Sequence, residues 1–181
     1  METGDEGEFD LASDGSWMVA RLEIDHIEQV EPELAARVLA EARQRLTATL
    51  RTGDRLADAP RGFWLGLAVA AEDLSERLAG RMLDTVGLQP FDLGGGQFGR
   101  RTASIGWAPF PWQAAAPEAM PLPDVRRVAV RALRLAQRAG RNQAVGMLPE
   151  GAEPSAAVVR VERTAGPDLI DQTPTAPIPT R

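Results

Sequence analysis

The chain has 181 residues, of which 44% are hydrophobic and 25% charged, as is typical of one globular domain with short appendages. It has no cysteine and a single histidine, which excludes disulfides, thiolate nucleophiles, iron–sulfur clusters and Cys/His zinc sites. The formal net charge of −6 argues against a protein that binds nucleic-acid polymers. The sequence lacks an apolar run of roughly 20 residues and a basic signal-peptide region. We therefore expect a cytoplasmic protein without membrane insertion.

Hydrophobic patterning predicts alternating strands and helices from residue 17 onward. WMVARLEI (17–24) is an apolar run of strand length, dense enough for the interior of a sheet. Apolar residues then recur every three or four positions over 27–50, which predicts a helix with Pro32 near the first turn of its main part. The Gly, Asp and Pro residues of RTGDRLADAPRG precede FWLGLAVA (63–70), a second buried strand in a two-strand unit.

The second half of the folded region is predicted to contain two more helices, a hairpin and a final strand. We expect Asp73 to cap a helix that ends at Gly87. PFDL and RRTASIGW are predicted to pair across the turn GGGQFG. A proline-rich loop (108–123) leads into a helix closed by Gly140, and QAVGML supplies the last strand.

The resulting order is β, α, ββ, α, ββ, α, β. This order predicts an α/β fold, an α+β sandwich in which helices pack on a single mixed sheet. We divide the chain into a disordered acidic lead-in (1–15), one folded domain (16–148) and a Pro/Ala/Thr-rich tail or linker (149–181). The segment AAVVRVER in the tail has the pattern of one further strand.

Four segments of the folded domain, in chain order, resemble the signatures of GGDEF domains, the diguanylate cyclase family. ARLEIDHIEQV is similar to LDIDHFKxIND, and RTGD followed by five residues and PRGFW is similar to RxxD, five residues and GGDEF. TASIGWAPFP resembles VTVSIGVA, and VAVRALRLAQRAGRNQAVG resembles ADRALYxAKxxGRNRVV. The resemblance implies a nucleotidyl-cyclase or palm-like central sheet flanked by helices, and a bacterial signal-transduction role. The family reaction joins two GTP molecules into cyclic di-GMP across a two-fold interface.

The same resemblance implies that the domain is degenerate. Gly62 stands where the family has its metal-binding carboxylate, and Pro60 has no N–H to offer a phosphate. Gln137 replaces the lysine that contacts phosphate, whereas the arginine of the GRN motif is retained. The degenerate active-site positions are Glu23, Pro60, Arg61, Gly62, Phe63, Trp64, Gln137 and Arg141. Because such sites lose a factor of about a hundred to a thousand in rate for each removed group, we expect no catalytic residue.

Two carboxylates of the first strand region remain as candidate metal ligands. Glu23 replaces the first-strand metal aspartate of the family, and Asp25 follows two residues later. With the hairpin carboxylate gone, we expect one to be a solvated acid and the other a partner at the sheet edge, so no metal site is predicted. Magnesium would be needed only for residual cyclase activity. We expect His26 to be a partly buried structural residue.

One motif of the family is intact. Arg51 and Asp54 reproduce its RxxD inhibitory site, and Arg81 falls where the family supplies a second arginine. Guanidinium groups can bond the O6/N7 edge of guanine, and a carboxylate accepts from its N–H groups. The resemblance thus implies a cyclic di-GMP site. The competing interpretation is structural: Arg51 ends a helix, Asp54 shapes a turn and Arg81 is a solvated helix residue.

We therefore predict a catalytically inactive GGDEF-type regulatory domain that binds cyclic di-GMP and has no other cofactor. Its expected partners are cyclic di-GMP and a protein or a second copy of itself. Two alternatives stay open, namely an interaction or dimerisation module that binds no nucleotide, and an active cyclase with an aberrant signature. Trp64 and Trp112 are expected to be core or loop anchors, or else part of an exposed docking patch.

Overall fold

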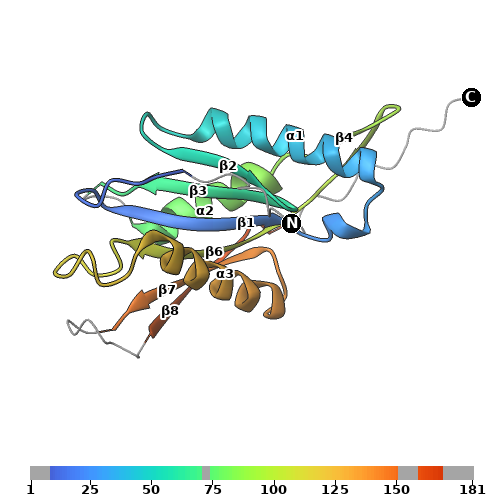
Figure 1. Cartoon of the computed structure of the whole chain (residues 1–181). Helices are drawn as coiled ribbons and strands as arrows, with labels where there is room; N and C mark the ends of the chain where they lie inside the picture. Colours follow the sequence, from blue (N-terminus) through green and yellow to red (C-terminus); the bar gives the residue numbers. More distant parts are fainter. Residues whose placement is uncertain (1–8, 71–73, 151–158, 169–181) are drawn as a thin grey trace, which may run out of the picture.

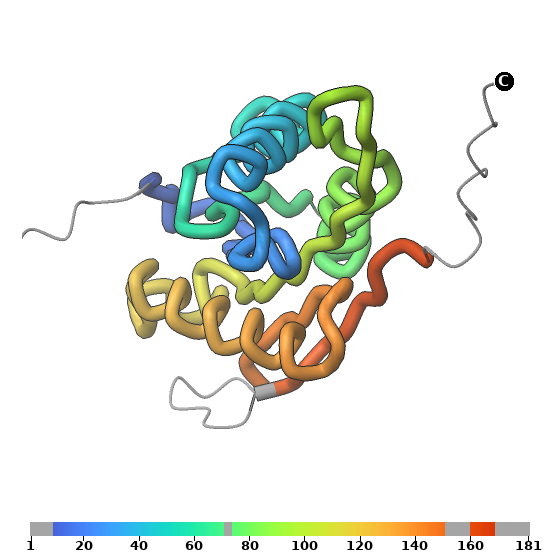
Figure 2. The backbone as a smooth tube through the Cα atoms, turned by 90° about the vertical axis from the view of Figure 1, so that its right-hand side faces the viewer, coloured from blue at the N-terminus to red at the C-terminus, as the bar shows by residue number. Residues whose placement is uncertain are grey.

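The computed structural model describes residues 9–70, 74–150 and 159–168. Its centre is a six-stranded sheet in the order β2-β3-β1-β6-β7-β8, in which β6 and β7 are parallel and the other neighbours antiparallel. Helices α1 and α2 cover one face and α3 covers the other (Figures 1 and 2). The predicted α/β fold with helices flanking a central sheet is confirmed.

The elements have the following bounds. The central strands are β1 (Trp17–Ile24), β2 (Arg55–Ala59), β3 (Gly62–Ala68), β6 (Ala103–Phe110), β7 (Gln143–Pro149) and β8 (Val159–Ala165). The helices are α1 (Pro32–Thr49), α2 (Ser75–Gly87) and α3 (Leu122–Arg138), with a short 3-10 turn at Ile27–Gln29. A separate two-stranded ribbon consists of β4 (Phe91–Gly94) and β5 (Gln97–Gly99).

The side chains of β1 alternate between two apolar clusters, because successive residues of a strand point to opposite faces. Met18, Ala20, Leu22 and Ile24 pack with buried residues of α1 and α2 in the larger cluster. Val19 joins the smaller cluster beneath α3. The central strand is therefore buried on both sides, as the dense apolar run predicted.

Most predicted elements are present at the expected places. The first strand, the helix with Pro32 in its first turn, the helix that ends at Gly87 and the strand over QAVGML are all confirmed. The final helix begins at Leu122 and the chain turns at Gly140. The predicted cap at Asp73 lies outside the described residues.

The predicted pairing of PFDL with RRTASIGW is wrong. β4 pairs instead with the three residues of β5, across glycines with positive φ at 94, 95 and 96. β6 lies between β1 and β7 in the central sheet, and all but one of its residues are buried. A strand buried on both faces is stabilised more by the sheet than by a short exposed ribbon.

Two described segments extend beyond the predicted domain of residues 16–148. β8 pairs with β7 over residues 143–149 and so joins the same sheet. Before β1, Leu11 is buried in the apolar cluster beneath α3. No helix among the described residues combines the length and hydrophobicity needed to cross a bilayer.

Gly106 determines how closely α3 approaches the sheet. A Cβ atom at this position would lie 2.0 Å from the backbone nitrogen of Leu133 and 2.1 Å from the carbonyl oxygen of Ala129. We expect Gly106→Ala to lower the free energy of unfolding by about 2 kcal/mol or more, since the backbone of α3 must move. Gly80→Ala in α2 is the matched control, because its Cβ meets nothing closer than 3.6 Å, and it should be neutral or stabilising. Equal losses in urea unfolding of the two variants would contradict this account.

Candidate functional site

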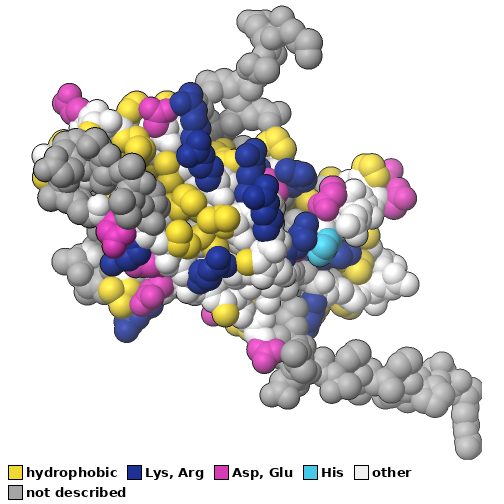
Figure 3. Space-filling view, turned by 90° about the horizontal axis from the view of Figure 1, so that it is seen from below, with side chains coloured by type: hydrophobic (Ala, Val, Ile, Leu, Met, Phe, Trp, Pro, Cys, Tyr) yellow, Lys and Arg dark blue, Asp and Glu magenta, His cyan; other side chains and the backbone are white. Residues whose placement is uncertain are grey.

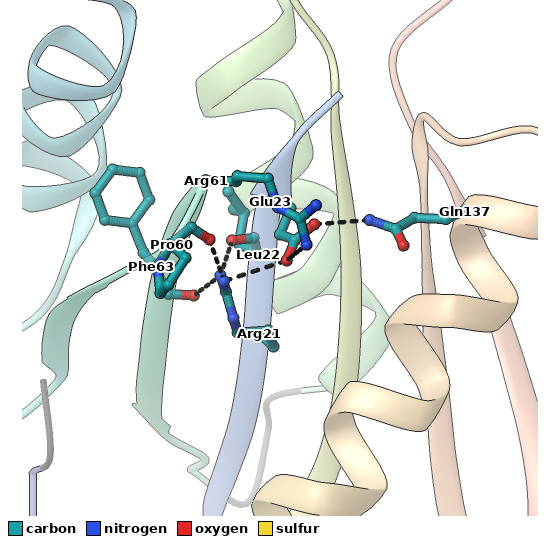
Figure 4. Close-up of polar contacts among 7 residues, drawn as sticks. All are labelled: Arg21, Leu22, Glu23, Pro60, Arg61, Phe63 and Gln137. Carbon is teal, nitrogen blue, oxygen red and sulfur yellow. Dashed lines mark hydrogen bonds and ion pairs between the residues drawn. The ribbon is translucent and has the colours of Figure 1, made fainter. Parts of the chain in front are cut away.

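A buried guanidinium in β1, that of Arg21, lies beside the turn between β2 and β3. Arg21 Nη1 donates hydrogen bonds to the carbonyl oxygens of Leu22 at 2.7 Å and Phe63 at 3.4 Å. Its Nη2 donates to Glu23 Oε1 at 3.2 Å and to the carbonyl oxygen of Pro60. Figure 4 shows these four oxygens around one guanidinium group. Arg21 is therefore an internal cation surrounded by oxygen ligands.

Glu23 connects this cation to the β2–β3 turn and to α3. Its Oε1 also accepts a hydrogen bond from Arg61 Nη2 at 3.2 Å, and its Oε2 accepts one from Gln137 Nε2 of α3 at 2.9 Å (Figure 4). Only 8% of Glu23 is exposed. A buried carboxylate requires such donors, and here two arginines and an amide supply them.

Burial shifts the pKa of Arg21 below its ordinary value, since the charged form loses its hydration. The nearby Arg61 acts in the same direction, and the Glu23 carboxylate acts in the opposite one. The guanidinium remains protonated because arginine does not lose its proton in proteins. The site thus contains a permanent positive charge.

The turn between β2 and β3 presents the carbonyl oxygen of Pro60 to this charge. Pro60 and Arg61 form a two-residue connection between the paired Ala59 and Gly62. Arg61 has a φ of 63°, in the left-handed region, and its carbonyl oxygen accepts a hydrogen bond from the N–H of Ile24 at 3.0 Å. The turn is therefore anchored to the end of β1.

Gly62 stands where a carboxylate is expected from the resemblance, and the structure leaves no room for one. A Cβ atom at this position would lie 2.0 Å from the carbonyl oxygen of Leu22. The close approach arises because Gly62 pairs with Glu23 in the β1–β3 register. Any side chain at position 62 would therefore force the two strands apart.

The prediction that one first-strand carboxylate is solvated is wrong. Asp25 is 5% exposed, and accepts hydrogen bonds from Thr102 Oγ1 and Ser104 Oγ at 2.6 Å each. It also accepts one from the backbone N–H of Asn142 at 3.0 Å. Asp25 thus fixes β6 and the turn after α3 to the end of β1. The described residues include no group of three or more acidic or histidine side chains that could hold a metal.

The expectation that His26 is partly buried is wrong. His26 is exposed, has a φ of 59° and lies 3.4 Å from the Gln29 amide through its Nδ1. Trp112 is buried in the cluster beneath α3, as expected of a core anchor. Trp64 is half-buried, with the guanidinium carbons of Arg21 and Arg126 at 5.7 and 5.6 Å from its ring centre. Arg141 has a φ of 65° in the turn after α3.

The residues of the RxxD motif lie at the opposite end of α1 from its Pro32 turn. Asp54 accepts hydrogen bonds from the backbone N–H groups of Arg51 at 2.8 Å and Ala68 at 2.9 Å. Its carboxylate therefore shapes the turn that joins α1 to β2, as the structural interpretation predicted. Arg51 is exposed.

Arg81 lies in the wall of a cavity of about 630 Å³ between α1 and α2. The cavity is lined by Arg45, Thr49, Arg77, Gly80, Arg81, Asp84, Thr85, Leu88 and Gln89. The Nε and Nη2 atoms of Arg81 are buried and have no hydrogen-bond partner within the described residues. Arg81 is thus not the solvated helix residue of the structural interpretation. Thr49, which also lines the cavity, is the last residue of α1 and lies two residues before Arg51.

Sequence reasoning missed Arg21. The residue lies in the middle of an apolar strand, and a charged residue in such a run is rarely buried without partners. A charged residue inside an apolar strand was therefore the feature of the sequence that could have indicated a buried polar site. The identity of its partners could not be inferred, since Pro60 and Phe63 are 39 and 42 residues away.

Solved structures with the same arrangement of strands and helices are GGDEF domains. The GGDEF domain of DgcB from Caulobacter crescentus, solved in complex with c-di-GMP, matches with a TM-score of 0.59 and 17% identity, over 71% of this chain and 75% of that one. This chain has the GGDEF-domain fold. The GGDEF domain of TpbB (YfiN) from Pseudomonas aeruginosa matches with a TM-score of 0.60 and 21% identity, over 70% and 74%.

A third similar structure is the diguanylate cyclase SiaD from P. aeruginosa in complex with its activator SiaC. It matches with a TM-score of 0.58 and 23% identity, and the match covers 70% of this chain and 48% of that one. No protein-family model and no curated protein sequence matches this chain. The fold shared with these solved structures supports the resemblance found in the sequence.

We expect the Arg21 guanidinium to be the main polar support of the GGDEF-like end. Arg21→Met should lower the free energy of unfolding by about 3–5 kcal/mol, because Glu23 and three carbonyl oxygens lose a buried donor. Arg61→Met is the control. Its side chain is 55% exposed, so its bond to Glu23 should contribute no more than about 1 kcal/mol. The two values are measured by urea unfolding, and similar losses would rule out a special role for Arg21.

Proposed function

We propose that this chain is a catalytically inactive GGDEF-type regulatory domain that binds cyclic di-GMP. Inactivity is supported by the internal cation in β1, the Arg21 guanidinium. The family reaction, as the resemblance implies it, depends on a divalent cation held by carboxylates. Here the Arg21 guanidinium occupies Glu23 Oε1 and the nearby carbonyl oxygens. A second cation beside it would be repelled, and position 62 has no space for the missing carboxylate.

Cyclic di-GMP binding is supported by two guanidinium nitrogens of Arg81 that have no partner among the described residues. A buried donor without a partner costs roughly 1–3 kcal/mol, a cost that a bound phosphate or guanine would remove. Arg45 and Arg77 line the same cavity, and arginines bind both phosphate oxygens and the guanine edge. Asp54 and the exposed Arg51 follow α1 at the side of the cavity that Thr49 lines. Arg51, Asp54 and Arg81 are therefore our proposed ligand-binding residues.

The ligand would act by changing how the domain docks to a protein or to a second copy of itself. A cyclic dinucleotide has two guanine bases and two phosphates, so two arginine sites can share one ligand or an intercalated pair. Such sharing would crosslink two helices or two subunits. The protein would then act in signal transduction as a receiver of the nucleotide.

Calorimetry with cyclic di-GMP tests the receptor function. We expect binding by the unaltered chain and a loss of affinity of about tenfold or more, about 1.4 kcal/mol, in Arg51→Ala and in Arg81→Met. Arg81→Met should also be as stable as the parent or more stable, because it removes buried unsatisfied nitrogens. Loss of binding without loss of stability distinguishes a ligand site from a structural arginine.

Arg37→Ala is the matched control for this experiment, since Arg37 is exposed on α1 and does not line the cavity. It should bind cyclic di-GMP within about twofold of the parent. If the unaltered chain gives neither heat nor a thermal shift at high micromolar ligand, the receptor function is wrong, and the nucleotide-free interaction module takes its place.

Catalytic inactivity has its own test. Incubation with GTP and magnesium should yield no cyclic di-GMP. Gly62→Asp should not restore the reaction, because its Cβ collides with the Leu22 carbonyl oxygen while Arg21 still occupies Glu23. Product is detected by chromatography against a synthetic standard. Turnover by the unaltered chain would mean that the internal cation does not block the site.

A further inference from the structure

The outer face of α3 carries a stripe of arginines. Arg127, Arg131, Arg134 and Arg138 are all exposed, and their spacing of four, three and four residues places them on one side of the helix. Eleven residues of helix extend about 16 Å. Figure 3, which views the molecule from below Figure 1, shows arginine side chains along and around a hydrophobic patch, with acidic side chains toward the margins.

Few acidic groups near this stripe offset its charge. Arg127 forms an ion pair with Asp124, and no ion pair joins Arg131, Arg134 or Arg138 to another described residue. Like charges four residues apart on a helix destabilise it. The arrangement therefore places positive charges together on a chain whose net charge is −6. An anionic partner would remove this cost.

The stripe borders a cavity that two apolar side chains, Trp64 and Val130, help to line. The cavity measures about 340 Å³ and is lined by Trp64, Arg126, Arg127, Val130, Arg131 and Arg134. Trp64 is half-buried, with the Arg126 guanidinium 5.6 Å from its ring centre. None of the described carboxylates lines the cavity. Exposed arginines around a partly accessible tryptophan are typical of the centre of a protein–protein interface.

We propose that this arginine face of α3 binds an acidic polypeptide segment of a partner protein. A single small anion would engage one or two of the guanidinium groups, whereas a segment of about 16 Å or more can pair with the whole stripe. Trp64 and Val130 give such a segment an apolar contact that a phosphate backbone would not use.

This face is separate from the cavity that contains Arg81. α3 covers one face of the sheet, and α1 and α2 cover the other. The acidic segment and a ligand of the Arg81 cavity would therefore not compete for the same residues. The proposal does not depend on cyclic di-GMP binding, and its failure would leave the proposed receptor function untouched.

Fluorescence anisotropy at about 150 mM salt tests the proposal, since this salt screens weak surface attraction. The probe is a fluorescein-labelled 16-residue peptide of Glu-Leu-Glu-Glu repeats. We expect saturable binding that Arg131→Glu/Arg134→Glu weakens by about tenfold or more. The neutral pair Arg131→Gln/Arg134→Gln should weaken it less but in the same direction, which also covers the case that the charge-reversed chain fails to fold.

Arg37→Glu/Arg55→Glu is the matched control, because both arginines are exposed on α1 and β2 and the change in net charge is the same. It should bind the peptide within about twofold of the parent. A 16-nucleotide poly-dT and phosphatidylserine vesicles should bind more weakly than the peptide. The proposal is overturned if the peptide does not bind or if the control loses as much affinity as the Arg131/Arg134 variant. It is also overturned if either competitor binds more tightly than the peptide, because the face would then belong to a nucleic-acid or membrane site.

Discussion

The guanidinium of Arg21 is the interaction on which the GGDEF-like end of this domain depends. It joins β1, the β2–β3 turn and β3 through three carbonyl oxygens, and it is neutralised by Glu23. Glu23 in turn binds Gln137 of α3 and Arg61 of the turn. A buried charge is tolerated only when its surroundings supply opposite charge and hydrogen bonds. The strand, the turn and the helix must therefore hold their relative positions for Arg21 to remain inside.

The sequence differences from the family are easier to understand as one set than one by one. A permanent internal cation needs a carboxylate and backbone oxygens but no metal, so it requires no carboxylate at position 62. Gly62 lets β3 approach β1 so closely that no side chain fits there. Gln137, where the resemblance implies a lysine, supplies a neutral donor to Glu23. A second cation at that position would compete with Arg21 for a carboxylate that already accepts from two arginines.

Local pattern predicted most elements, and long-range pairing decided the rest. The apolar run of β1 and the periodicity of α1 specify their own conformation, because each buries a face with a fixed repeat. The predicted partner of β6 is wrong because local pattern favours PFDL, which is close in sequence, over β1, which lies some eighty residues earlier. The same limit applies to the site. Asp25 was identified as a candidate acid, but its burial depends on Ser104 and Asn142, which are 79 and 117 residues away.

The sheet separates two surfaces of different chemistry. On the α1–α2 side, Arg81 has buried nitrogens that meet no hydrogen-bond partner among the residues the structure describes, in a cavity that other arginines line. On the α3 side, the inward face of the helix contributes Gln137 to the internal site, while the outward face presents the arginine stripe. Because α3 is held to β1 through Glu23, its outer face is fixed relative to the core rather than free to tilt. A rigid helix presents its charges with less loss of conformational entropy on binding than a loop would. The polar network around Glu23 therefore also fixes the orientation of the outer surface.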